Sequence, residues 1–377
     1  MDIVKEYDQW LGRLSRPEDN ERLCQILRDV EMQSDLHVTE WRDPDFFAIH
    51  QLHLGESYTL VVEDKTGVYT GTERIVCFCT AVIRDGWIDG VLKRTAYVCD
   101  LRMVKGYRRS RILPKACRDF FEYLEREKGV DAFYSVSLTD NKGAVAARRF
   151  SGGHVMSEFR MCNIQLIGRV KAPKNNVVIA TSEDIPEISN FLDRQSRTRM
   201  FGYRFDNQEL KKRLLVWPGL SINDFHIIKN RDGDVIACAA PWDASNGNLR
   251  KTRVDGYFGK MKLIRRAYNV EAFFRGFRKL PKVGVCFNQL SLTHLEIEND
   301  DPLLLEDIIK SVLRNSNKKE LHFINLMLPK GSALEQGVEG FRSQSIDFDV
   351  NCFLPKKSPF HGQKFRTVRP GFEMAIH

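Results

Sequence analysis

The chain has 377 residues, of which 42% are hydrophobic and 29% are charged, and its formal net charge is +8. This composition is typical of a soluble globular protein, and the length is sufficient for two domains that each bury a core. No apolar run approaches the roughly 20 residues that a membrane-spanning helix needs, so a transmembrane protein is excluded.

The cysteines indicate a reducing compartment. There are nine of them, an odd number, and they are scattered without the spacing of metal ligands. Cys77 and Cys79 are two residues apart in an apolar run, which predicts two buried thiols on one strand face. The first residues are polar and acidic, with no visible signal peptide. We therefore expect a cytoplasmic protein without a metal site.

The beginning of the chain predicts two helices followed by antiparallel strands. An amphipathic helix is expected at 21–33 and a second one at 43–54. An acidic residue followed by proline opens the second helix, and a glycine closes it. Strands are expected at 58–63 and 74–83, with glycine-containing turns after each.

The most informative stretch follows, and it predicts a strand, a basic turn, a helix and another strand. The first strand, 95–104, is rich in aromatic and β-branched residues, and the turn at 105–111 contains four cations. The helix at 112–126 has apolar residues at helical spacing, with proline in its first turn. The second strand is expected at 132–138.

The basic turn predicts an anion site. Free backbone N–H groups and the positive end of the helix dipole converge at a helix start. Arg108, Arg109 and Arg111 add full charges that pair well with phosphate oxygens. A solvated basic loop explains the same turn equally well.

These residues resemble the acyl-CoA loop of the GNAT N-acetyltransferase superfamily. That family has a strand ending in Leu-x-Val, a Pro-x-Tyr-Arg turn and a Gly-x-Gly at the helix start. Residues 141–144 and 152–153 resemble its later Asn-x-x-Ala and Gly-Phe segment. The loop residues that match are Leu101, Met103, Tyr107 and Arg108.

The sequence also departs from the family pattern. The family glycines fall on Arg109, Arg111 and Leu113, where bulky side chains make a close approach of the pyrophosphate harder. The tyrosine that often acts as general acid in the family falls on Arg148, so the general acid is unassigned.

The resemblance implies that the first half binds acetyl-CoA as the acyl donor. Main-chain groups of Leu101, Arg102 and Met103 would bind the pantetheine arm, and Asn141 would lie near the thioester. The pyrophosphate would be held by the stretch that contains Arg108, Arg109, Ser110, Arg111 and Ile112.

Acetyl transfer to an amine requires removal of a proton from an ammonium group with an ordinary pKa of about 10, so a base or a water relay is needed. Asp100 is our first candidate base, although a salt bridge at the strand end explains it somewhat better. His154 is the second candidate. His50 and His53 lie three residues apart, and without a carboxylate cluster around them a structural role is favoured.

Residues 168–176 are polar and basic and contain Pro173, which predicts a domain boundary. The fold class is α/β (α+β), with two tandem GNAT-like domains at 1–172 and 173–377, each a mixed, mostly antiparallel sheet flanked by helices. The second half repeats the element order of the first, with strands at 177–181, 225–229, 235–240, 289–297 and 321–328 and helices at 185–193, 207–216 and 302–314.

The second half is expected to be degenerate. Its equivalent of the basic turn, 298–302, contains three carboxylates, which repel a pyrophosphate. Asp301 is better explained as the N-cap of the helix that begins at Pro302.

An insertion at 247–287 has no place in the family pattern. Between Arg250 and Lys282 there are eleven Lys and Arg residues against Asp255 and Glu271, a surplus of nine, which exceeds the surplus of the whole chain. A basic amphipathic helix is expected at 263–279. Its cations either cover an aromatic core or bind a polyanion, either RNA or an anionic membrane.

The leading function is therefore acetyl transfer from acetyl-CoA to the amine of a small molecule or peptide. One alternative is a non-catalytic GNAT-fold binding module, and another is an aminoacyl-tRNA-dependent transferase that uses residues 250–282 to hold RNA. The sequence leaves the acceptor and the oligomeric state open.

Overall fold

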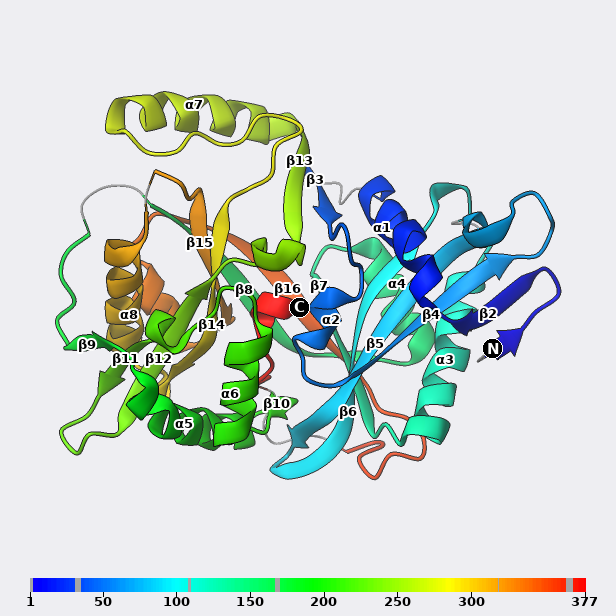
Figure 1. Cartoon of the computed structure of the whole chain (residues 1–377), viewed down its shortest axis with the longest axis horizontal. Helices are drawn as coiled ribbons and strands as arrows, with labels where there is room; N and C mark the ends of the chain where they lie inside the picture. Colours follow the sequence, from blue (N-terminus) through cyan, green and yellow to red (C-terminus); the bar gives the residue numbers. More distant parts are fainter. Residues whose placement is uncertain (1–2, 31–34, 108–109, 167–169, 318, 364–368) are drawn as a thin grey trace.

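The structure, a computed structural model, describes residues 3–30, 35–107, 110–166, 170–317, 319–363 and 369–377. Most of its strands belong to one large sheet with helices on both faces (Figure 1). Within these ranges no helix combines the length and the apolarity that crossing a bilayer requires. The mixed, mostly antiparallel architecture predicted from the sequence is confirmed.

The first half of the chain supplies one wing of this sheet. Its strands are β1 (Ile3–Glu6), β2 (Trp10–Leu14), β4 (Glu56–Asp64), β5 (Ile75–Ile88), β6 (Val91–Met103), β7 (Ala132–Leu138) and β8 (His154–Gln165). Its helices are α1 (Asn20–Asp29), α2 (Ala48–Gln51), α3 (Ile112–Lys128) and α4 (Lys142–Ser151). The face of α3 that packs on the sheet carries Ile112, Ala116, Phe120 and Leu124, at the spacing that predicted the helix.

The second half supplies the other wing. Its strands are β9 (Val177–Ile179), β10 (Gly202–Tyr203), β11 (His226–Lys229), β12 (Val235–Trp242), β14 (Gln289–Ile297), β15 (Phe323–Pro329) and β16 (Ser343–Phe353). Its helices are α5 (Ile185–Arg197), α6 (Asn207–Val216), α7 (Gly259–Arg275) and α8 (Pro302–Asn315). A separate two-stranded sheet pairs β13 (Lys251–Tyr257) with β3 (Leu36–Trp41) of the first half.

The expectation of one sheet for each half is wrong, because the last strand of each half lies against the other half. The main sheet has 14 strands, with β6, β7, β16, β8, β15 and β14 as its centre. β16 pairs antiparallel with β7 and β8, and β8 pairs antiparallel with β15. The division into domains at 172/173 stays a prediction. Strands from the two halves are nevertheless hydrogen-bonded to each other in one sheet.

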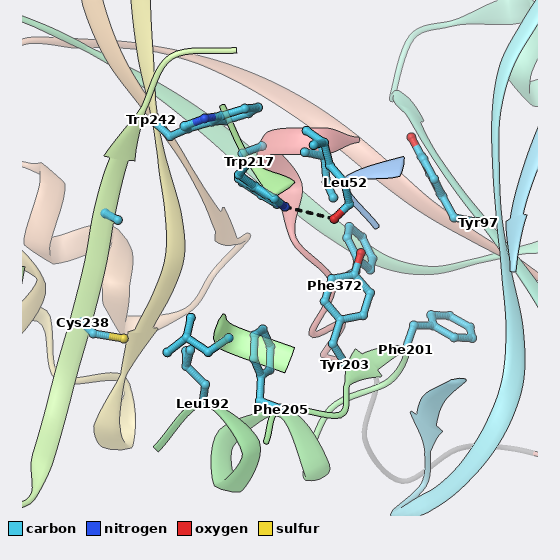
Figure 2. Packing of buried hydrophobic residues seen from close by; sticks show 14 of the residues in the cluster. Leu52, Tyr97, Leu192, Phe201, Tyr203, Phe205, Trp217, Cys238, Trp242 and Phe372 are labelled. Carbon is cyan, nitrogen blue, oxygen red and sulfur yellow. Dashed lines mark hydrogen bonds between the residues drawn. The ribbon is translucent and has the colours of Figure 1, made fainter. Parts of the chain in front are cut away.

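The two halves also share a hydrophobic core. It contains Leu52, Tyr97 and Tyr134 from the first half, and Phe201, Trp217 and Phe372 from the second. Figure 2 shows the Trp217 indole N–H directed at the carbonyl of Leu52, to which it donates a hydrogen bond of 3.0 Å. Because this bond joins α2 to the end of α6, it fixes the halves relative to each other.

Two helix limits differ from expectation for local reasons. Instead of a helix over 43–54, α2 covers Ala48–Gln51, because the Asp45 carboxylate accepts the Phe47 amide in a turn that competes with the helix. The basic helix begins and ends earlier than expected and stops at Gly276, which has a φ of +70°.

The shared sheet and core predict that the whole chain unfolds in one transition. Urea unfolding followed by tryptophan fluorescence and by far-UV circular dichroism should give coincident curves. Trp217→Phe leaves the Leu52 carbonyl unpaired and should lower the free energy of unfolding of the whole chain by about 1–3 kcal/mol. Two separate transitions, with only the second half affected by the substitution, would contradict the shared core.

Candidate active site

The first candidate site is the opening between β6 and β7. These strands pair in parallel over Thr95–Tyr97 and Ala132–Tyr134 and then diverge. Within the described ranges, residues 98–103 have no strand partner on the β7 side. No strand therefore engages their main chain on that side, although the Leu101 carbonyl accepts a hydrogen bond of 3.2 Å from the Arg102 guanidinium. Strand backbone without a strand partner can bind an extended ligand.

A β-bulge lies within the opening. Phe78 pairs with Arg102 and Thr80 with Cys99, so β6 has one more residue than β5 in this interval. Asp100 lies in the bulge with a φ of +55°, which is uncommon for a residue with a side chain. Bulges disrupt the ladder and redirect a side chain, and here the redirected side chain is the Asp100 carboxylate.

Asp100 is held in a buried cluster of charges. The two terminal nitrogens of the Arg42 guanidinium, Nη1 and Nη2, donate to its two oxygens at 2.9 and 2.7 Å, and His50 Nε2 lies 2.7 Å from Oδ2. Glu40 lies 2.7 Å from the same guanidinium. Burial alone would raise the pKa of Asp100, but Arg42 and the His50 hydrogen bond outweigh burial and keep it well below its usual range.

This cluster bears on the roles expected for Asp100 and His50. Asp100 as a base stays a prediction, but a carboxylate with a lowered pKa and two occupied oxygens accepts a proton poorly. The premise that no carboxylate lies near His50 is wrong, since Asp100 contacts its Nε2. His50 Nδ1 is buried without a hydrogen-bond partner.

The cluster also has the donor types of a metal site. Donor atoms of His50, Cys99 and Asp100 lie within 4.8 Å of one another. The Arg42 guanidinium, however, already binds both carboxylate oxygens, so a cation occupies the place a metal would need. The geometry favours an ion pair over a metal centre.

The basic turn lies where β6 and β7 have diverged. The Tyr107 hydroxyl donates to Asp64 Oδ2 at 3.0 Å, and burial together with this bond raises the pKa of Tyr107 to about 12. Arg111 is exposed at the start of α3 with a φ of +57°, and the Ile112 amide donates to Ser110 Oγ at 3.4 Å. Arg108 and Arg109 lie outside the residues that the structure describes.

The remaining predicted cofactor residues lie around the same opening. Leu101 and Met103 pack on the core beneath α3, and Arg102 lies 3.9 Å from Glu40. Asn141, which follows β7, caps α4, with its side-chain oxygen accepting the amides of Gly143 and Ala144. The role of these residues in binding a cofactor stays a prediction.

Two further predicted residues lie apart from Asp100. His154 is exposed at the start of β8, which lies three strands from β6, or about 14 Å at ordinary strand spacing. Arg148, at the position of the family tyrosine, donates to Asp349 at 3.1 Å and to Asn351 at 2.7 Å. The structure therefore separates His154 from Asp100 and gives Arg148 a structural partner.

Aromatic rings fill the base of the opening. Tyr97 and Tyr134, the last paired residues of β6 and β7, have ring centroids 5.4 Å apart. The ring of His377 lies 4.0 Å from Tyr97, and Phe372 lies 5.1 Å from Tyr134. Tyr97, Tyr134 and Phe372 are buried in the shared core at the point where the two strands diverge.

The second half contains the same arrangement between β14 and β15. These strands pair in parallel over three residues and then diverge, and β14 has a bulge at His294, with a φ of +51°. The C-terminal segment 369–374 lies in this opening and lines a small cavity there together with residues of β14 and β15. Glu373 accepts the amide of His294 at 2.7 Å, and burial raises the pKa of Glu373.

The acidic turn after β14 also has internal partners. Arg194 pairs with Glu298 and Arg369 pairs with Asp300. Asp301 Oδ1 accepts the Leu303 amide at 2.8 Å, which confirms Asp301 as the N-cap of α8. The second opening thus has both its bulge and its turn occupied by the protein's own side chains.

Comparison with known proteins rests on structure, because no protein-family model and no curated protein matches the sequence. A crystal structure of Saccharomyces cerevisiae N-myristoyltransferase with bound myristoyl-CoA superposes with a TM-score of 0.60 at 9% identity, covering 93% of this chain and 84% of that one. The fold is that of the GNAT-type N-acyltransferases. A probable N-acyltransferase from Enterococcus faecalis gives a TM-score of 0.52 at 9% identity, covering 94% and 74%. The GNAT fold predicted from the sequence is confirmed.

Arg42 was missed by sequence reasoning, although it holds Asp100 in the buried cluster. It is 58 residues from Asp100 and has no motif around it. A buried arginine needs a carboxylate partner, but the sequence does not say which carboxylate, and only the folded chain brings the two together.

The buried pair predicts a large stability effect. Asp100→Asn keeps the bulge, since Asn tolerates positive φ, but leaves Glu40 as the one remaining carboxylate on Arg42 among the described residues and should cost about 1.5–3 kcal/mol of unfolding free energy at neutral pH. Because the folded pKa is lowered, the wild-type advantage is complete above about pH 4 and declines as the pH falls further.

The matched control is Glu127→Gln, which breaks the exposed Arg126–Glu127 pair and should change stability by less than about 0.5 kcal/mol. Urea denaturation of both variants as a function of pH makes the measurement. Equal effects of the two substitutions would contradict the buried-pair account.

Proposed function

We propose that the protein is an acyl-CoA-dependent N-acyltransferase whose donor site is the opening between β6 and β7. The single observation that carries this proposal is the contrast between its two related openings. The first ends at a basic turn and a helix start, whereas in the second the bulge amide of His294 is already bound by Glu373 and the strand ends at an acidic turn. A pyrophosphate is attracted to the first and repelled by the second.

The donor is held along β6 and at the start of α3. Main-chain groups of Leu101, Arg102 and Met103 bind the pantetheine arm, because they have no strand partner on the β7 side. The Arg111 amide, with the side chains of Arg108, Arg109 and Arg111, binds the pyrophosphate. The Ser110 amide donates to the Tyr107 carbonyl at 2.9 Å and the Ile112 amide to Ser110 Oγ at 3.4 Å, so these two residues shape the turn. Asn141 lies across the opening, at the end of β7.

The transferred group is short, and acetyl-CoA is the proposed donor. The rings of Tyr97, Tyr134, Phe372 and His377 occupy the floor of the opening. A long acyl chain would have to displace these packed rings, whereas an acetyl group requires no rearrangement. The yeast enzyme of the same fold was crystallised with myristoyl-CoA, so chain length is the property in which the two proteins would differ.

The reaction is attack of an amine on the thioester carbonyl, with cleavage of the C–S bond and release of the CoA thiol. Bulge amides near Asp100 that lack a strand partner are suited to stabilise the oxyanion. Asp100 holds His50 through Nε2, which leaves Nδ1 as the atom that accepts the proton from the amine. Asp100 is thus a positioning residue, and His154 is kept as the second candidate base.

The acceptor is a small-molecule or peptide amine, and the reaction is placed in the cytoplasm. The cytoplasm is proposed because all nine cysteines are free thiols, as expected in a reducing compartment.

Acetyl-CoA binding tests the donor site. Isothermal titration should show binding by the wild type and a loss of about tenfold or more for Arg111→Ala, since a charge-assisted hydrogen bond contributes about 1.5–3 kcal/mol. Arg126→Ala removes the same charge from the other end of α3 and should leave binding unchanged. The absence of binding, with RNA co-purifying instead, would favour the RNA-dependent alternatives.

Donor chain length tests the acyl group. Thiol release with a panel of amines should give the highest kcat/KM for acetyl-CoA, with a loss of about tenfold or more for myristoyl-CoA. A preference for myristoyl-CoA would contradict the acetyl assignment while leaving the donor site in place.

The base assignment is tested by a pair of histidine variants. His50→Gln should lower kcat by about 100-fold or more, the usual contribution of a general base, at unchanged acetyl-CoA affinity. His154→Gln should retain activity within about twofold. The reverse order of effects would make His154 the base.

A further inference from the structure

The helix α7 has an apolar face that points away from the protein. Leu263, Val270, Phe273 and Phe274 are between 59 and 79% exposed. At 100° per residue they fall within one third of the helix circumference. Figure 1 shows α7 above β13 and apart from the main sheet, so this face is turned to solvent along a helix about 25 Å long.

The opposite face of α7 attaches the helix to the protein. Tyr268 and Ala272 are buried, and Tyr268 packs edge-on against Phe277 in the segment that follows the helix. Arg342 binds Glu271 at 2.5 Å, and Asn269 accepts the Leu280 amide at 2.8 Å. The helix is therefore fixed in place with its apolar face outward, the reverse of an ordinary surface helix.

Cations lie on and beside the outward apolar face: Lys260 and Lys262 border it, and Arg266 lies within it between Val270 and Phe273. Lys260, Lys262 and Arg266 are exposed, and none of them has an ion-pair partner among the described residues. Apolar side chains between unpaired cations match the boundary of an anionic bilayer, where the cations meet headgroups and the apolar groups enter the acyl region.

We propose that α7 docks the protein on a membrane surface that contains anionic lipid, lying in the plane of the interface. Two observations favour this occupant over others. Leu263 and Val270 offer nothing to a nucleic acid, which stacks its bases on aromatic rings in a basic groove. A second copy of the chain would bring the same unpaired cations of both helices together across a two-fold axis, which is repulsive.

Vesicle co-sedimentation of the full-length protein tests this docking. The wild type should bind vesicles of phosphatidylcholine with phosphatidylglycerol, with an affinity that falls as salt is added, and should bind phosphatidylcholine alone weakly. L263S/F274S should lose about tenfold or more, because both apolar side chains leave the interface. K260Q/K262Q/R266Q should lose about a hundredfold, at about fivefold for each cation.

The control variants lie on α6, which has exposed residues of the same types. Leu215 is 86% exposed, and Lys211 and Lys212 are exposed beside it. L215S and K211Q/K212Q should bind vesicles as the wild type does, and all variants should melt at the wild-type temperature, since none alters a buried side chain. Loss of binding in the α6 variants would overturn the proposal.

Three further results would also overturn the proposal. One is no binding to the anionic vesicles, and another is vesicle binding that both α7 variants retain. The third is tighter binding to an RNA oligonucleotide that depends on the cations but not on Leu263 and Phe274. A dimer in analytical ultracentrifugation that L263S/F274S abolishes would instead assign the face to a second copy of the chain.

Discussion

The pairing of β16 with β8 is the constraint on which the rest of the structure depends. Each of these strands ends one half of the repeated fold, and each also pairs with an inner strand of the other half. The exchange turns two sheets into one and places the two strand openings on either side of the shared core. Neither half has a complete set of backbone hydrogen bonds without the other, so the geometry of the donor site depends on the whole chain.

The two openings show how one arrangement can serve different purposes. Both have a parallel strand pair that diverges, with a bulge five residues after the pairing begins. In the first, the bulge residue Asp100 is neutralised by Arg42, and a basic turn follows. In the second, the amide of His294 donates a hydrogen bond to Glu373 of the C-terminal segment, so this bulge amide already has a partner within the chain. The basic turn and the filled bulge together explain why the donor is assigned to the first half.

The local sequence pattern predicted many of the helices and strands, but it did not predict the buried cluster around Asp100. α6, β7 and β14 have the limits expected from apolar periodicity, which is a property of neighbouring residues. The strand exchange was not predictable, because β8 and β16 have the same alternating pattern whichever partner they pair with. The Arg42–Asp100–His50 cluster was missed because its members are 50 and 58 residues apart in sequence. Their burial, together with their mutual contacts, sets the pKa of Asp100, and this burial arises only when the core has assembled.

Hydrogen exchange measured by mass spectrometry, with and without acetyl-CoA, tests the central claim most directly. The account predicts protection of the amides in 98–103 and 110–115, which lie along β6 and at the start of α3. The matching stretch of the second half, 292–305, should exchange at the same rate in both samples, because its bulge amide is bound by Glu373 and its turn is acidic. Protection of 292–305 in place of 98–115 would contradict the account, as it would move the donor to the second half.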